Sequence, residues 1–254
     1  MDEQPILETR QLTKRFGGLA AINNVSVRIR EGFITSIIGP NGAGKTTLFN
    51  VLTGFLRSDG GDYYLKGKRI TGLPPYRITR MGMARTFQLI RVFPKLSVLD
   101  NVMLGCLGLK GDNVLYAILK TQGAVSQFYQ AKATAMKVLE LIGLPEFANE
   151  YAFALSYGQQ KLVEIGRVLA SDPQVILLDE PMAGLSVTMI DRMVELIFQL
   201  KKENRTVILV EHNMDVVMDI SDQIVVLNFG EEIAAGSPAE IMNRAEVLDA
   251  YLGV

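Results

Sequence analysis

The chain of 254 residues carries 26 lysine and arginine against 27 aspartate and glutamate residues, so no basic field favours nucleic acid as a partner. A hydrophobic share of 48% predicts a globular protein with an ample core, and the single cysteine, Cys106, excludes an internal disulfide and fits a reducing cytosol. The apolar runs are too short to span a bilayer and the acidic start MDEQPILETR is unlike a signal peptide, so we expect a chain that does not itself cross a membrane.

The N-terminal part of the chain predicts antiparallel strands that lead into a Gly-rich loop. Residues 6–38 show apolar alternation, for example at Val25, Val27 and Ile29, which is typical of half-buried strands. The segment DYYLKGKRI at 62–70 predicts a hairpin that turns at Gly67.

The Gly-rich loop reads GPNGAGKTT and matches the pattern G-x-x-x-x-G-K-[ST], which wraps nucleotide phosphates. An apolar strand is expected before it at 34–38 and a helix after it, and this context favours a nucleotide site over a chance match in a turn. Backbone N–H groups of the loop and the helix N-terminus both attract phosphate. The residues expected to bind nucleotide here are Gly39, Pro40, Asn41, Gly42, Ala43, Gly44, Lys45, Thr46 and Thr47.

Single residues of this loop have distinct expected roles. Lys45 is expected to reach the β- and γ-phosphates, and the Thr46 hydroxyl is expected to take a place on Mg²⁺. Gly42 and Gly44 allow a close approach of the backbone and positive φ. The loop therefore predicts binding of ATP together with Mg²⁺.

A second stretch, residues 89–157, is mainly helical in pattern. A capping-box-like start at 97–100 precedes Val102, Met103 and Cys106 on one helix face.

A further helix is expected at 131–142, ended by Gly143 and Pro145. Glycines and turn-forming residues predict loops at 105–113 and near 121–126.

The C-terminal part returns to strands alternating with helices. Strands are expected at 175–178, 207–210 and 224–227, and an amphipathic helix at 187–202. This alternation predicts a mostly parallel sheet with ligand sites at the C-terminal ends of its strands.

The segment VILLDE at 175–180 is an apolar strand that ends in two carboxylates. Asp179 is expected to hold Mg²⁺ through water, and Glu180 is placed to orient or deprotonate the attacking water. A strand that simply runs out into solvated acids is the alternative, and the phosphate loop in the same chain favours the functional interpretation.

The segment LSYGQQ at 155–160 precedes a helical run and offers a second anion site at a helix N-terminus. One ATP needs only one such phosphate-binding surface, so Ser156 and Gly158 suggest a site that serves the nucleotide of another subunit. The residues alone favour the simpler interpretation that Ser156 is an N-cap.

In this order and spacing, GPNGAGKTT, LSYGQQ and VILLDE resemble the nucleotide-binding subunit of an ABC transporter over essentially the whole chain. The resemblance implies an α/β fold: a P-loop NTPase with a RecA-like mixed sheet core, an antiparallel β subdomain and an inserted α-helical subdomain. It implies a single ABC ATPase domain over residues 1–254. Within it, 1–88 and 158–254 are expected to form the nucleotide-binding core with the N-terminal β subdomain, and 89–157 the helical signature subdomain.

The resemblance also implies roles for single residues. Phe16 matches the aromatic residue that stacks on adenine, and Ser156, Gly158 and Gln159 match the signature that closes over the nucleotide of a facing subunit. His212, the one histidine of the chain, matches the switch histidine that contacts the γ-phosphate. The implied catalytic residues are Glu180, His212, Gln88 and Lys45, and the implied Mg²⁺ ligands are Thr46, Gln88 and Asp179.

Two positions depart from the family pattern. Tyr157 replaces the first glycine of the usual LSGGQ signature, and Ser186 stands where the turn after the catalytic glutamate usually ends in aspartate. A hydroxyl can hydrogen-bond across a dimer but supplies no charge, so the resemblance does not imply the usual charged contact between two sites for Ser186.

Within the family, the segments RFGGLAAINNVS, RTFQ, EPMAGL and AEVLDAYLG look most like an ATP-binding subunit of branched-chain amino acid importers. This resemblance implies an ATPase at the cytoplasmic face of the inner membrane. Its implied partners are integral membrane permease subunits, a second and different ATP-binding subunit, and indirectly a substrate-binding protein.

Other functions remain open at this stage. ATPases of urea or amide importers and of lipopolysaccharide-type exporters resemble the chain too. A nucleotide-sensing module without turnover, or a soluble ABC protein of iron–sulfur assembly, are rivals from other classes. The transported solute cannot be predicted, because the ATPase subunit does not touch it.

Overall fold

The computed structural model describes residues 4–106 and 122–252. The chain divides into two compact units. The core unit consists of Met1–Arg85, Gln174–Ala183 and Ile197–Val254, and the helical unit of Thr86–Pro173 and Gly184–Leu196. The expected division into functional subdomains at residues 89 and 157 stays a prediction.

An antiparallel sheet forms the N-terminal part of the core unit. Its strands follow the order β2-β1-β5-β6, and β3 pairs with β1. The predicted hairpin is confirmed, since Lys66 and Gly67 both have positive φ between β5 and β6. The strands are β1 Leu7–Phe16, β2 Leu19–Val25, β3 Arg28–Ile29, β5 Gly60–Leu65 and β6 Lys68–Arg69.

A second, mostly parallel sheet carries the order β11-β10-β4-β9-β8-β7, in which only the β10–β11 pair is antiparallel. Every residue of β4, β8 and β9 is buried, as expected for parallel strands covered on both faces. The predicted parallel sheet is therefore confirmed. Its strands are β4 Ile34–Ile38, β7 Met83–Arg85, β8 Val175–Asp179, β9 Thr206–Val210, β10 Gln223–Asn228 and β11 Glu231–Gly236.

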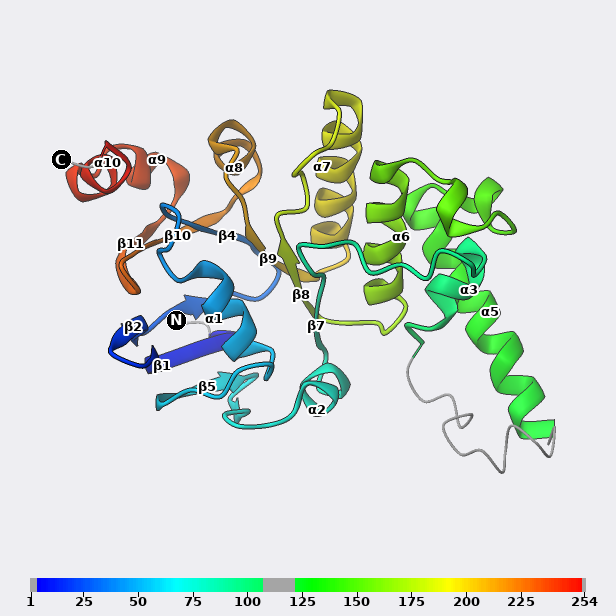
Figure 1. The fold of residues 1–254 in the computed structure, drawn as a ribbon, viewed down its shortest axis with the longest axis horizontal. Helices are drawn as coiled ribbons and strands as arrows, with labels where there is room; N and C mark the ends of the chain where they lie inside the picture. The colour runs from blue at the N-terminus through cyan, green and yellow to red at the C-terminus, as the bar shows by residue number, and fades with distance from the viewer. Residues whose placement is uncertain (1–3, 107–121, 253–254) are drawn as a thin grey trace. The chain divides into compact units, whose positions relative to one another are not determined.

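Neighbouring residues of the parallel strands point to opposite faces and so build two cores. Ile37 and Val225 belong to a large core that also contains residues of the antiparallel sheet and of helix α1, Lys45–Leu52. Ile38 and Val226 belong to the opposite core, which is covered by α8, α9 and α10. Figure 1 shows α1 between the two sheets and these three helices on the far side of the parallel sheet.

The remaining helices of the core unit are short. They are α2 Pro75–Arg80, α8 Met214–Ile220, α9 Pro238–Met242 and α10 Ala245–Leu252. Within the described ranges, every helix is too short or too polar to serve as a membrane span.

The helical unit is built on α3 Val98–Met103, α5 Gln122–Ile142 and α6 Tyr157–Leu169, which pack on one another. Helix α7, Val187–Lys202, begins in this unit and ends in the core unit. Two short 3₁₀ turns, Pro145–Phe147 and Ala152–Ala154, lie between α5 and α6.

Three sequence predictions for this region need correction or lie outside the described residues. Residues 122–126 are helical rather than a loop, because α5 begins at Gln122, nine residues before the expected start at 131, and a single glycine such as Gly123 is tolerated inside a helix. Cys106 follows the end of α3 at Met103 and so does not share that helix face. The loop expected at 107–113, and residue 121, lie outside the described residues.

Candidate functional site

The Gly-rich loop connects β4 to α1, and its backbone geometry requires glycine. Gly39 has a φ of 147°, and a Cβ there would come to 2.0 Å of the Leu227 carbonyl oxygen. Gly44 has a φ of 101°, and a Cβ there would come to 2.3 Å of the Ala21 carbonyl oxygen. The positive φ predicted for Gly42 and Gly44 is confirmed. The loop therefore folds tightly against β2 and the end of β10.

Helix α1 begins directly after this loop, with Gly44 as its N-cap. Glycine has no side chain that could cap the first-turn amides, and α1 shows no side-chain cap. These amides and the helix dipole form an anion site at the mouth of the loop.

Lys45 holds its positive charge inside the loop. Its ammonium group donates hydrogen bonds to the carbonyl oxygens of Gly39 at 2.6 Å and Pro40 at 2.9 Å. Burial lowers the pKa of Lys45, although the carboxylates of Glu180 and Asp179 oppose this shift. The loop therefore combines a buried cation with uncapped backbone amides, the two features that bind a polyphosphate.

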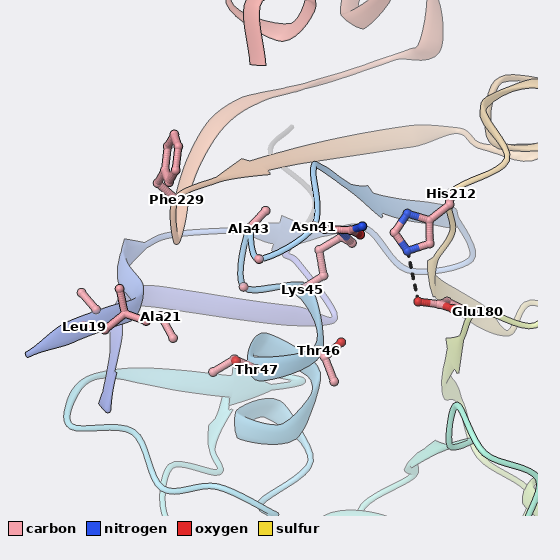
Figure 2. A pocket seen from close by; sticks show the side chains of 13 residues that line it. Leu19, Ala21, Asn41, Ala43, Lys45, Thr46, Thr47, Glu180, His212 and Phe229 are labelled. Atoms are coloured by element: carbon pink, nitrogen blue, oxygen red, sulfur yellow. Dashed lines mark hydrogen bonds and ion pairs between the residues drawn. The ribbon is translucent and has the colours of Figure 1, made fainter. Parts of the chain in front are cut away.

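A pocket of about 280 Å³ opens over this loop. Figure 2 shows the loop and Lys45 in its middle, Glu180 and His212 at one end, and Phe229 and Leu19 at the other. Its lining consists of Leu19, Ala20, Ala21, Asn41, Gly42, Ala43, Gly44, Lys45, Thr46, Thr47, Glu180, His212 and Phe229.

Phe16 lies beside this pocket without being part of its lining. It pairs with Leu19 across the β1–β2 hairpin. The residue is 49% exposed, and the Lys14 ammonium lies 5.4 Å from the centre of its ring. The predicted stacking residue is thus accessible, and its strand partner Leu19 reaches the pocket itself.

Glu180 and His212, predicted from separate segments, lie together in this pocket. The His212 Nε2 atom is 3.1 Å from Glu180 Oε1, and the Glu180 N–H donates to the Val210 carbonyl. Glu180 has a φ of 49°, which is uncommon for a residue with a side chain and is often found at functional sites. A carboxylate supported by an imidazole at the end of a parallel strand is suited to general base catalysis.

Glu211 supports this pair and was not singled out from the sequence. Its buried carboxylate accepts hydrogen bonds from the backbone N–H of Met182 at 2.8 Å and of His212 at 3.1 Å. It therefore joins the segment after Glu180 to the segment that carries His212. A carboxylate directly after the apolar strand 207–210 is the signal that could have indicated it.

Asp179 lies in a buried ion pair that the sequence did not predict. Its Oδ2 atom accepts a hydrogen bond from Arg85 at 2.9 Å, and both side chains are almost fully buried. Burial raises the pKa of the Asp179 carboxyl, and the Arg85 guanidinium opposes that rise. Arg85 also donates to Asn50 Oδ1 at 2.7 Å and Thr53 Oγ1 at 3.3 Å, so it connects β7 and β8 to the end of α1. The sequence signal that could have indicated this pair is an arginine directly after the apolar residues Met83 and Ala84.

The residues predicted to hold Mg²⁺ are divided between the two units. Thr46 presents an exposed hydroxyl in the first turn of α1, and Asp179 supplies carboxylate oxygens at the end of β8. Hydroxyl and carboxylate oxygens are the donors that Mg²⁺ prefers, so the donor set of the core unit fits this ion. Gln88 is exposed and belongs to the helical unit.

The signature residues lie at the N-terminus of α6 in the helical unit. Ser156 is the N-cap: its hydroxyl accepts from the Gln159 N–H at 3.4 Å, and the Gln159 side chain accepts from the Ser156 N–H at 2.9 Å. The interpretation of Ser156 as an N-cap is therefore confirmed. Gly158 is buried, and a Cβ there would come within 3.0 Å of the Met189 side chain.

The two departures from the family pattern also lie in the helical unit. The Tyr157 ring is half exposed and packs beside Gly184, where an added Cβ would be 3.2 Å from it. The Ser186 hydroxyl lies 3.3 Å from that of Thr188, close to the start of α7.

The phosphate loop between β4 and α1, the acidic end of β8 and the mixed sheet together define a P-loop nucleotide-binding protein. Residues 22–183 match the protein family described as ABC transporter, and the chain belongs to this family.

Known relatives support the same assignment. The chain is 44% identical to a high-affinity branched-chain amino acid transport ATP-binding protein of Pseudomonas aeruginosa, over 98% of each sequence. Its fold matches the ADP conformation of an ATP-binding cassette of an ABC transporter with a TM-score of 0.85, at 33% identity over 99% of this chain and 100% of that one. A dimeric bacterial ABC transporter cassette matches with a TM-score of 0.75, at 29% identity over 91% and 98%. The expected P-loop NTPase fold is thus confirmed.

Proposed function

We propose that the chain is the ATP-hydrolysing subunit of an importer for branched-chain amino acids. The substrate class is inferred from the 44% identity, over nearly the full length of both chains, to a branched-chain amino acid transport ATP-binding protein. The pocket around Lys45 supports the ATPase activity, because it combines a phosphate loop with a carboxylate–imidazole pair.

The phosphate loop is proposed to hold ATP through its backbone amides and Lys45. The Lys45 ammonium group bonds to the carbonyl oxygens of Gly39 and Pro40 within the loop, and it would turn to a bound β- or γ-phosphate. Thr46 and Asp179 are the proposed holders of Mg²⁺ in the core unit, with Gln88 as a further ligand. Bound Mg²⁺ would neutralise part of the phosphate charge.

Glu180 is the proposed general base. It would take a proton from water while the water oxygen forms a bond to the γ-phosphorus and the bond to the ADP oxygen breaks. His212, held by its contact with Glu180 and by Glu211, would orient the carboxylate and donate to the γ-phosphate. Release of phosphate and ADP then returns the pocket to its starting state.

A second ATP-binding subunit is proposed to complete the site. Ser156, Gly158 and Gln159 occupy a helix N-terminus of the helical unit, and by family resemblance they would close over the nucleotide of a facing chain. A different ATPase chain is the proposed partner, together with membrane permease subunits and, through them, a substrate-binding protein. The proposed location is the cytoplasmic face of the inner membrane, and the proposed domain is one ABC ATPase with a helical signature subdomain at 89–157.

The dependence on a second subunit is tested by measuring ATP hydrolysis against protein concentration. A composite site predicts that the rate per chain falls on dilution and rises when the partner ATPase is added. A high rate per chain that stays constant down to nanomolar protein would contradict it.

Uptake measurements test the transport function directly. Deleting the gene from its host should abolish high-affinity uptake of radiolabelled leucine, isoleucine and valine, while urea uptake serves as the control. The wild-type chain should restore uptake and Glu180→Gln should not. Unchanged leucine uptake in the deletion strain would overturn the proposed substrate class.

A further inference from the structure

The turn between β10 and β11 has an unusual residue at its tip. The two strands pair up to Asn228 and Glu231, so the turn consists of Phe229 and Gly230 alone. Their φ values are 46° and 81°, and two consecutive positive φ values are the mark of a type I′ turn. This turn favours Asn-Gly, because a bulky side chain is strained in the left-handed region. Phenylalanine therefore stands where the turn itself prefers asparagine.

The tip of this hairpin is fixed to the phosphate loop. The Gly230 N–H donates to the Ala43 carbonyl at 3.1 Å, and the Gly230 carbonyl accepts from the Asn23 N–H at 2.8 Å. The Asn23 side chain donates to Glu231 at 2.7 Å. Because these bonds hold the turn from both sides, the position of Phe229 relative to the loop is set by backbone contacts.

The Phe229 ring gains little from burial within the chain. The residue is 86% exposed, the largest value for a large apolar residue in the described ranges. It nevertheless lines the nucleotide pocket together with Leu19, which is also largely exposed. An apolar ring that is both strained and solvated at a binding pocket indicates a contact made by ligand.

The two ends of the pocket differ in chemistry, and this difference indicates which part of a ligand Phe229 contacts. Glu180 and His212 lie at one end and Phe229 and Leu19 at the other, with the phosphate loop between them (Figure 2). The two ends of a nucleotide differ in the same way, since its terminal phosphate is anionic and its base and ribose offer flat and apolar surfaces. The reacting phosphate belongs at the carboxylate–imidazole end, which leaves the nucleoside for the apolar end.

We propose that Phe229 contacts the nucleoside part of the bound nucleotide and contributes to its affinity. This proposal rests on the proposed function, because it assumes that the pocket binds ATP and ADP. Leu19 forms the facing apolar surface, and Phe16 stays the separately predicted stacking residue. The strain at Phe229 is then retained for binding rather than for folding.

The variant Phe229→Asn separates binding from folding, since asparagine suits the turn and lacks the ring. The thermal midpoint of the ligand-free full chain should stay unchanged or rise. The dissociation constant for ADP, measured by calorimetry, should increase about tenfold, as expected for the loss of an aromatic contact to a nucleoside. Phe229→Tyr, which keeps the ring, should bind ADP like the wild type.

Inorganic tripolyphosphate is the probe without a nucleoside. Its affinity should be the same for the wild type and for Phe229→Asn. Replacing Phe128, an exposed residue of the helical unit, by Asn should change neither ligand's affinity. Equal ADP affinity in the wild type and in a folded Phe229→Asn variant would overturn the proposal. The exposed ring would then have to be explained by a contact with another chain. A parallel loss of ADP and tripolyphosphate affinity would also overturn it, because the residue would then act through the loop. Failure of the wild type to bind ADP would instead contradict the proposed function.

Discussion

Two helix N-termini carry predicted phosphate-binding roles, and their caps differ. Helix α1 begins at Gly44, which has no capping side chain, in a loop that also buries the Lys45 ammonium group. Helix α6 begins at Ser156, whose hydroxyl and backbone N–H exchange hydrogen bonds with Gln159. The first helix presents open amides, and the second already has a complete capping box.

The two helices therefore use the partial positive charge of an N-terminus in two different ways. The α1 terminus depends on glycine and on contacts with Ala21 and Leu227, so its geometry is set for a ligand before the ligand arrives. The α6 terminus is stable by itself, and a phosphate that binds there must share or replace the bonds of Ser156. We therefore expect changes around α1 to affect binding and chemistry at this chain's own phosphate loop. Conservative changes at Ser156 should leave binding at that loop unchanged and lower the stability of the helical unit.

The largest effect is expected for Glu180→Gln, which tests whether the α1 pocket separates binding from chemistry. Glutamine keeps the volume and loses the base, so hydrolysis by the assembled complex should fall about 10²–10⁴-fold. ATP affinity should be retained, because the phosphate loop is unchanged. Phosphate release and nucleotide binding are measured on the same samples, with the exposed Glu203→Gln as control. Hydrolysis at the wild-type rate would remove Glu180 from its proposed role.

The next effect concerns the anchoring of the other end of α1. Arg85→Met leaves Asp179 buried without its cation, so unfolding in urea should show a loss of about 3–5 kcal/mol. Arg69→Met is the matched control, because Arg69 pairs with Asp62 at the surface and should contribute no more than about 1 kcal/mol. Equal losses in both variants would show that the buried pair does not hold α1 against β7 and β8.

Lys45→Ala tests the contribution of the buried cation beside the open amides of α1. Removing the one side-chain cation of the loop should weaken ATP binding by about 10²-fold, through the loss of charge-assisted hydrogen bonds. Equilibrium binding of ATP to the full chain measures this change, and Lys68→Ala on the exposed strand β6 is the control. An unchanged dissociation constant would mean that the backbone amides suffice.

The smallest effect is expected for the capping box of α6. Ser156→Ala should lower the free energy of unfolding by about 1 kcal/mol, and Ser156→Gly by only a few tenths, roughly as at other N-caps. ATP binding to the same chain's own phosphate loop should be unaffected in both variants. A Ser156→Ala protein as stable as the wild type would show that the cap bonds do not stabilise α6, and the contrast with α1 would lose its basis.

Local patterns allowed much of this architecture to be predicted. The phosphate loop, the strands at 175–178 and 207–210 and the helix at 187–202 were all indicated by runs of residues that determine their own backbone conformation. The turn at Gly67 followed from the same local chemistry. Helix α5 was predicted too short, because the glycine and serine near its start indicate a turn by pattern, whereas an isolated glycine such as Gly123 is tolerated inside a helix.

The contacts around the catalytic carboxylates needed the tertiary structure. Arg85 reaches Asp179 across 94 positions of sequence, and Glu211 reaches Met182 across 29. No local pattern encodes such pairs, because neighbouring strands of a parallel sheet come from distant segments. The same holds for Phe229, whose residue type indicates little until the hairpin is seen on the phosphate loop.

The phosphate loop, the acidic strand end and the family can be predicted from short runs of residues, because each run has its own conformational and chemical requirements. Which side chains meet depends on the folded chain: the Glu180–His212 pair, the buried Arg85–Asp179 pair and the place of Phe229 at the pocket. Packing of the two sheets around α1 sets these distances, and packing is a property of the whole core rather than of any one segment.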